Sequence, residues 1–90
     1  MLTQKKIDAR LSALSGIVSD MSVGLGCLDG PEVVYEARTL KDRADGYGLY
    51  QLGLLAHEIE QAAVAGDLDT VRQLFGEIHG HLQQAPLLMQ

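Results

Sequence analysis

The connections between the apolar segments of this chain are too short for anything but neighbouring antiparallel helices. Residues 31–46, 48–65 and 68–84 each carry apolar side chains three or four positions apart, which is the spacing of one helical face. A single residue separates the first two segments, and Gly66-Asp67 separates the last two. Connections of this length reverse the direction of the chain, so consecutive helices must pack side by side.

A further helix is predicted from Thr3 to Val23, where Thr3 is a suitable N-cap. Whether this helix ends at Gly24 or continues to Cys27 stays open at this point. Its apolar face consists of Ile7, Leu11, Leu14, Val18 and Met21. The sequence therefore predicts an all-α protein, an antiparallel up-down four-helix bundle that forms a single domain over residues 1–90.

Turn and capping residues set the expected helix boundaries. Pro31 suits the first position of a helix, Gly46 suits a helix end, and Asp67 suits an N-cap. Pro86 is expected to prevent the last helix from continuing past about Gln84. The predicted core residues of these three helices are Val33, Ala37, Leu40 and Ala44, then Leu52, Leu55, Ala56, Ile59 and Ala63, then Val71, Leu74, Phe75, Ile78 and Leu82.

Composition excludes several classes of function. The net charge of −5 disfavours nucleic acid as a partner, because phosphate binding needs a basic surface. Cys27 is the only cysteine, which excludes an internal disulfide and is expected to be a small apolar filler. No apolar run is long enough for a signal peptide or a membrane span, so we expect a cytoplasmic protein without membrane contact. No metal-ligand or cofactor-binding pattern occurs, so no metal or cofactor is predicted.

The most informative motif is Ala37-Arg38-Thr39-Leu40-Lys41-Asp42-Arg43-Ala44, followed by Gly48. It resembles the centre of histidine phosphotransfer (HPt) domains, the intermediate carriers of bacterial phosphorelays. That centre reads Ala-His-x-Leu-Lys-Gly-x-Ala, with a glycine four residues later. Two positions depart from it: Arg38 stands where the phosphoacceptor histidine is expected, and Asp42 stands where the glycine is expected.

The resemblance implies a four-helix bundle whose second helix presents an exposed docking flank. In the family, the matching lysine neutralises the phosphoryl group and the glycine leaves room for the partner's acidic pocket. A guanidinium stays protonated and has no lone pair for attack, so Arg38 is not a phosphoacceptor. We predict a non-catalytic, HPt-like signalling module that binds a response-regulator receiver domain or a histidine kinase and regulates it by occupancy. The predicted partner-binding residues are Val34, Arg38, Lys41, Asp42 and Asp45.

Three alternatives stay open. The flank of 31–46 is equally typical of a solvated helix face with Arg38–Asp42 and Lys41–Asp45 ion pairs. The chain also fits a structural or dimerising bundle, with an exposed Val34 in the contact, and we expect a monomer or a weak dimer. The third is a phosphoacceptor-null form of an active protein, or phosphotransfer through another histidine. Of the three histidines of the chain, His57 is expected to be exposed, and His79 and His81 are expected to point to different sides of one helix.

Overall fold

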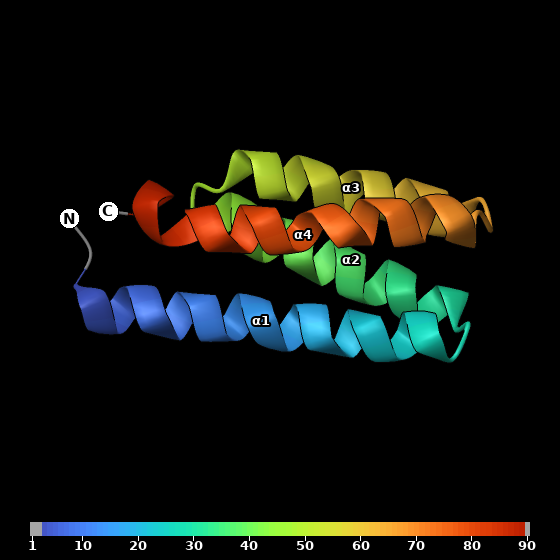
Figure 1. Ribbon diagram of the computed structural model, residues 1–90, viewed down its shortest axis with the longest axis horizontal. Helices are drawn as coiled ribbons and strands as arrows, with labels where there is room; N and C mark the ends of the chain where they lie inside the picture. Colours follow the sequence, from blue (N-terminus) through green and yellow to red (C-terminus); the bar gives the residue numbers. More distant parts are fainter. Residues whose placement is uncertain (1–2, 90) are drawn as a thin grey trace.

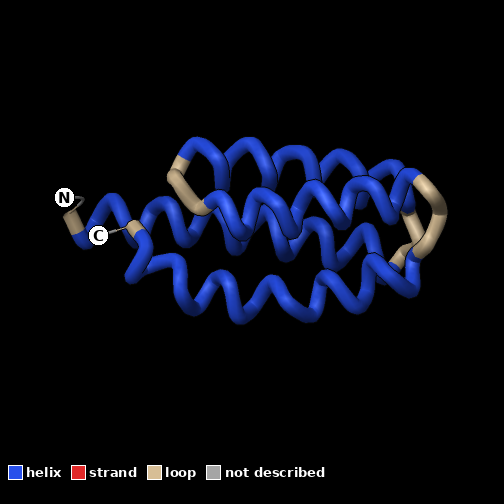
Figure 2. Tube along the Cα trace, turned by 90° about the horizontal axis from the view of Figure 1, so that it is seen from above, coloured by secondary structure: helices blue, strands red, loops and turns tan. Residues whose placement is uncertain are grey.

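The computed structural model describes residues 3–89, which form four helices in an antiparallel bundle (Figure 1). The helices are α1 (Gln4–Gly26), α2 (Gly30–Gly46), α3 (Tyr50–Val64) and α4 (Leu68–Leu88). Each helix contacts the next one in the sequence, and α1 also contacts α4. The three connections lie at the two ends of a rod that measures 40 × 19 × 18 Å (Figure 2). The predicted up-down four-helix bundle is confirmed.

Side-chain caps fix the start of three helices. Thr3 accepts a hydrogen bond from the Lys6 amide at 3.3 Å, as predicted. Asp29 caps α2, which therefore begins one residue before Pro31, and Asp67 caps α4 as predicted. At the other end, α1 continues through Gly24 and ends at Gly26, which answers the question that the sequence left open.

The turn between α2 and α3 is longer than the sequence predicted, because α3 begins at Tyr50 and not at Gly48. Gly48 has a φ of +78°, a left-handed conformation that suits glycine and cannot continue a helix. The amide of Leu49 donates to the carbonyl oxygen of Ala44 at 2.8 Å, which closes the end of α2. The Leu49 side chain is buried, so this turn is anchored in the core.

The predicted end of the last helix is wrong, because α4 passes through Pro86 and ends at Leu88. A proline inside a helix removes one amide donor and crowds the preceding turn. Here the free-energy cost of Pro86 is confined to the final turn of α4, and the burial of neighbouring side chains offsets it. Ala85 and Met89 are 1% and 6% exposed, and the Met89 amide still donates to the Ala85 carbonyl oxygen. Packing of these two residues therefore keeps the last turn helical.

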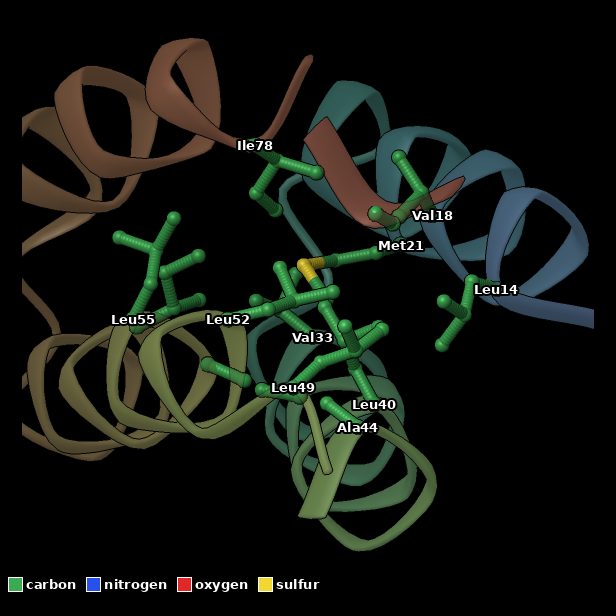
Figure 3. Packing of buried hydrophobic residues seen from close by; sticks show 14 of the residues in the cluster. Leu14, Val18, Met21, Val33, Leu40, Ala44, Leu49, Leu52, Leu55 and Ile78 are labelled. Atoms are coloured by element: carbon green, nitrogen blue, oxygen red, sulfur yellow. The ribbon is translucent and has the colours of Figure 1, made fainter. Parts of the chain in front are cut away.

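The core is aliphatic and draws on all four helices (Figure 3). Every predicted core residue of α2 and α3 is buried. In α4, Val71 and Ile78 are buried, whereas Leu74, Phe75 and Leu82 are only half-buried. Cys27 is exposed at the end of α1, so its predicted role as an apolar filler is wrong. Within residues 3–89, none of the helices has the length and apolar character that crossing a membrane requires.

Candidate functional site

The five predicted partner-binding residues lie on α2, but they differ in exposure. Arg38 and Asp42 are exposed, and Lys41 and Asp45 are half-buried. Val34 was expected to be exposed, and this is wrong: it is half-buried and packs against the core cluster. The flank is therefore a strip with an apolar edge at Val34 and charged groups along the rest of its length.

Arg38 forms an ion pair with Glu60 of α3. Its Nε donates to Oε2 of Glu60, and the two side chains are 66% and 10% exposed. The Arg38–Asp42 pair considered from the sequence is not formed, and Asp42 makes no side-chain hydrogen bond or ion pair within residues 3–89. The choice of partner has a physical reason. A carboxylate that is mostly removed from water gains more from a nearby cation than an exposed one does.

The pairing uses only a small part of the guanidinium group of Arg38. An arginine has five N–H donors, of which Nε carries one and the two terminal nitrogens carry four. In the described part of the chain, Nε alone is engaged with another side chain. The terminal nitrogens of Arg38 therefore make no hydrogen bond within residues 3–89, and the side chain that carries them is 66% exposed.

The second carboxylate oxygen of Glu60 faces a histidine. Oε1 lies 3.7 Å from Nδ1 of His57, which precedes Glu60 by three residues on α3. The sequence predicted an exposed His57, and its side chain is 45% exposed with Nδ1 near Glu60. Glu60 thus lies between groups from two helices, Arg38 of α2 and His57 of α3.

Lys41 and Asp45 form the ion pair that the sequence predicted, with Nζ and Oδ2 3.0 Å apart. The hydrogen bond to Asp45, followed by the charge of that carboxylate, raises the pKa of Lys41 above its ordinary value. Asp45 also touches α3, because a Cβ on Gly53 would overlap its Oδ1. The absence of a side chain at Gly53 lets α2 and α3 approach closely at this point.

A shallow hollow of about 450 Å³ adjoins Arg38. It lies where the first half of α2 meets the end of α3, and Tyr35 and Val64 on its border are each 64% exposed. We call it the α2–α3 hollow; its lining residues are Gly30, Pro31, Val34, Tyr35, Arg38, Ala63 and Val64. The strip on α2 therefore combines an apolar depression with a cation at its edge.

Glu60, Tyr35 and Val64 belong to this surface, and sequence reasoning did not assign them to it. A signal for Glu60 was present, because it falls among the buried positions Ala56, Ile59 and Ala63 of α3. A carboxylate at such a position requires a polar partner. Within residues 3–89, no three side chains of the types that bind metal ions lie close enough together to form a metal site. His79 is exposed on α4, away from this flank.

Comparison of the chain with family models, with curated proteins and with solved structures gives no match. The likeness to HPt domains rests on the residues of α2 and on the expected bundle. Of the motif positions, Ala37, Leu40 and Ala44 are fully buried and Lys41 and Arg38 lie on the outer flank. This division between core and surface follows from helical periodicity, whatever the ancestry of the chain.

Proposed function

We propose that this chain is a non-catalytic, HPt-like signalling module. It binds a receiver domain or a histidine kinase of a bacterial two-component pathway in the cytoplasm, and it regulates that partner by occupying its docking surface. The proposal adds no cofactor, no metal and no covalent step. It rests on the resemblance of residues 37–48 to the HPt centre and on the surroundings of Arg38.

The observation that carries the proposal is the exposure of Arg38 and its position beside the α2–α3 hollow. The resemblance assigns this residue to the position of the phosphoacceptor. In the structure its side chain is two-thirds exposed and borders an apolar hollow. A cation next to an apolar depression is complementary to a surface that offers a carboxylate beside an apolar side chain. Receiver domains hold their phosphoacceptor aspartate among other acidic residues, and a guanidinium can pair with such groups without reacting.

Docking would place the partner's apolar side chain in the α2–α3 hollow and its carboxylates near Arg38. Asp42 opposes this approach, because it is exposed and its charge is not paired with Arg38. The partner's pocket is then filled by a residue that accepts no phosphoryl group. Regulation by occupancy follows, since a productive phosphotransfer protein cannot use the same surface at the same time.

Binding is tested by titrating the isotope-labelled chain with purified receiver domains from the same genome. We expect one of them to shift the NMR signals of α2 around Val34 and Arg38. Arg38→Glu replaces attraction by repulsion and should cost on the order of 2 kcal/mol or more of binding free energy if the contact is desolvated. Val34→Asp should weaken binding comparably, because it places an unpaired charge in the apolar part of the contact. His79→Ala, on α4, is the control, and equal affinities for all four folded proteins would exclude this docking face.

The absence of catalysis is tested by radiolabelled phosphotransfer. The chain should stay unlabelled with an active kinase or a phosphorylated receiver, and acid-labile phosphate on any histidine would contradict the proposal. Arg38→His alone should be labelled poorly, because Asp42 still crowds and charges the approach. Arg38→His combined with Asp42→Gly rebuilds the family pattern around Lys41, so labelling is expected in that double variant. Efficient labelling of the single variant would show that Asp42 is no obstacle.

A dimerising bundle is the second candidate, and exposed apolar residues near one end of the molecule favour it. Tyr50 and Leu54 of α3 are 71% and 54% exposed, and Leu87 and Leu88 of α4 are 73% and 63% exposed. Light scattering over a range of concentrations distinguishes the candidates. A stable dimer that Leu54→Lys dissociates, together with no binding to any receiver domain, would support this candidate over the first.

A further inference from the structure

We propose that Glu60 is a positioning residue, which holds Arg38 by Nε so that its two terminal nitrogens present a fork to one carboxylate of the partner. The inference rests on the proposed function, and it names the residue on which the docking geometry of Arg38 depends. Glu60 touches Arg38 and does not itself contact the partner.

The first support is the fixed position of Glu60. Its side chain is 10% exposed, and its neighbours Ile59 and Ala63 on α3 are buried in the core. A carboxylate held in this way offers few alternative positions to the group that binds it. Arg38 reaches it from the next helix, so the contact fixes a long surface side chain against a rigid element.

The second support is the edge of the guanidinium that remains free. A guanidinium is planar and presents donors along two edges, one that includes Nε and one formed by the two terminal nitrogens. Glu60 occupies the Nε side, and the terminal nitrogens make no hydrogen bond within residues 3–89. Two parallel N–H groups on one edge match the two oxygens of a carboxylate. Arg38 can therefore bind Glu60 and a partner's carboxylate at the same time.

Lys41, the other cation of the flank, does not present a free pair of donors beside the hollow. Its ammonium nitrogen binds Asp45 on its own helix, and an ammonium offers no flat edge. The α2–α3 hollow lies beside Arg38 and does not include Lys41. The fork and the hollow together select a partner surface that carries a carboxylate next to an apolar side chain.

Positioning has a measurable consequence for affinity. A free arginine side chain loses rotamer freedom when a partner orders it, and this cost weakens binding. If Glu60 has already ordered Arg38, the cost is reduced before the partner arrives. The opposite effect is expected if Glu60 competes with the partner for Arg38, because removal of a competitor tightens binding. The sign of the change on mutation of Glu60 therefore separates the two roles.

The first measurement uses the free protein and needs no partner. In NMR spectra of the isotope-labelled chain, the Arg38 Nε–H signal should be resolved and protected from exchange with water. Glu60→Gln keeps an acceptor oxygen and should retain this signal, whereas Glu60→Leu should lose it. Glu58→Leu is the matched control, because Glu58 is an exposed glutamate of the same helix. Equal exchange in the wild type and in Glu60→Leu would overturn the positioning role.

The second measurement is the affinity of these variants for the receiver domain that binds the wild type in the titrations above. Glu60→Leu should bind roughly three- to tenfold more weakly, the value expected for one side chain that must be ordered on binding. Glu60→Gln should bind at least as tightly as the wild type, because it keeps the acceptor and removes a negative charge. Glu58→Leu should leave the affinity unchanged.

The outcomes distinguish failure of this inference from failure of the proposed function. Unchanged or tighter binding by Glu60→Leu, with Arg38→Glu still defective, would overturn positioning and leave the docking face intact. Equal binding by Arg38→Glu and the wild type would overturn the docking face itself. If neither a receiver domain nor a histidine kinase binds the wild type, the proposed function and the inference that rests on it both fail.

Discussion

Two buried glutamates on neighbouring helices meet opposite surroundings. The whole Glu60 residue of α3 is 8% exposed, and its side chain faces Arg38 and His57. Glu36 of α2 is 7% exposed, and burial is the largest cause of its raised pKa. A hydrogen bond with Glu32 is the second cause, and the carboxylates of Asp20 and Glu32 raise the pKa further.

The difference shows that α2 has two unlike faces. Toward α3, the charge of a buried carboxylate is balanced by a cation from α2. Toward α1, Glu36 lies near Asp20 of α1, and neither carboxylate forms an ion pair within residues 3–89. A proton on Glu36 relieves the repulsion between them. The face that balances its buried carboxylate by an ion pair is the one that carries Arg38.

The largest loss of stability is expected when Arg38 is replaced by an acidic residue, because Glu60 would then face a carboxylate, as Glu36 does. Arg38→Glu leaves Glu60 without its cation and places a second carboxylate beside it. We expect a loss of about 2 kcal/mol in the free energy of unfolding, below the usual cost of breaking a buried pair because Arg38 is largely exposed. The variant should regain stability as the pH falls, because protonation removes the repulsion. Urea unfolding at several pH values measures both effects.

A matched variant tests whether charge is the cause. Arg38→Gln removes the cation without adding a carboxylate, and it should lose less stability and show a weaker dependence on pH. If the Gln and Glu variants unfold alike at every pH, then the pair with Glu60 does not determine the stability of this face.

Replacing Glu36 should change the free energy of unfolding by a smaller amount and in the opposite direction, toward greater stability. Its pKa is raised above the ordinary value of 4.5, so the folded state holds this proton more tightly than the unfolded state. The stability that this provides is present below pH 4.5 and is lost as the pH rises through the raised pKa. Glu36→Gln is uncharged at every pH, and it should be more stable than the wild type by roughly 1 kcal/mol at neutral pH.

The comparison for Glu36 is made by urea unfolding of both proteins between pH 4 and pH 8. The stability advantage of Glu36→Gln should disappear toward the acid end of this range. Glu77→Gln, at an exposed position of α4, is the control and should show no such trend. An advantage that is constant across the range would mean that the proton on Glu36 is not involved.

The fold was predictable because its determinants are local. Helical periodicity placed Leu40, Ala56 and Ile59 on buried faces, and the short connections left no alternative to antiparallel neighbours. The exception is the end of α4, where burial of Ala85 and Met89 outweighs the local preference of Pro86. That packing involves residues distant in sequence, and a helix-breaking rule does not include it.

The candidate site was predictable only in part, for a related reason. The Lys41–Asp45 pair follows from spacing on one helix and is confirmed. The partner of Arg38 depends on how α3 is rotated against α2, so local spacing favoured Asp42 whereas the fold supplies Glu60. The α2–α3 hollow has the same origin, because Val34 and Val64 come from different helices.

The close approach of α2 and α3 gives a further, smaller prediction. Gly76 of α4 has open space around its Cα, so Gly76→Ala should stabilise the protein by up to about 1 kcal/mol through helix propensity. Gly53→Ala should fail to give this gain, because the new Cβ overlaps Asp45 Oδ1 and the carboxylate must leave Lys41. Thermal and urea unfolding of the two variants measures the difference.

A second substitution tests the cause assigned to Gly53. Combining Gly53→Ala with Asp45→Ala removes the overlap, so the double variant should recover the helix-propensity gain relative to Asp45→Ala alone. If Gly53→Ala already stabilises as much as Gly76→Ala, then the approach of α2 and α3 at this point places no demand on the residue type.

The smallest contribution to stability is expected from the Lys41–Asp45 ion pair. It joins one positive and one negative side chain, as the Arg38–Glu60 pair does, but its carboxylate is less buried. Lys41 and Asp45 are 38% and 39% exposed and lie on one helix, whereas Glu60 is 10% exposed and is reached from another helix. Solvent and salt screen the first pair more strongly. Double-mutant cycles with Ala at both positions of each pair should therefore give a weaker coupling for Lys41–Asp45, and added salt should abolish it first. Equal couplings with the same salt dependence would mean that the burial of Glu60 does not strengthen its bond to Arg38, and the contrast between the two faces of α2 would then rest on Glu36 alone.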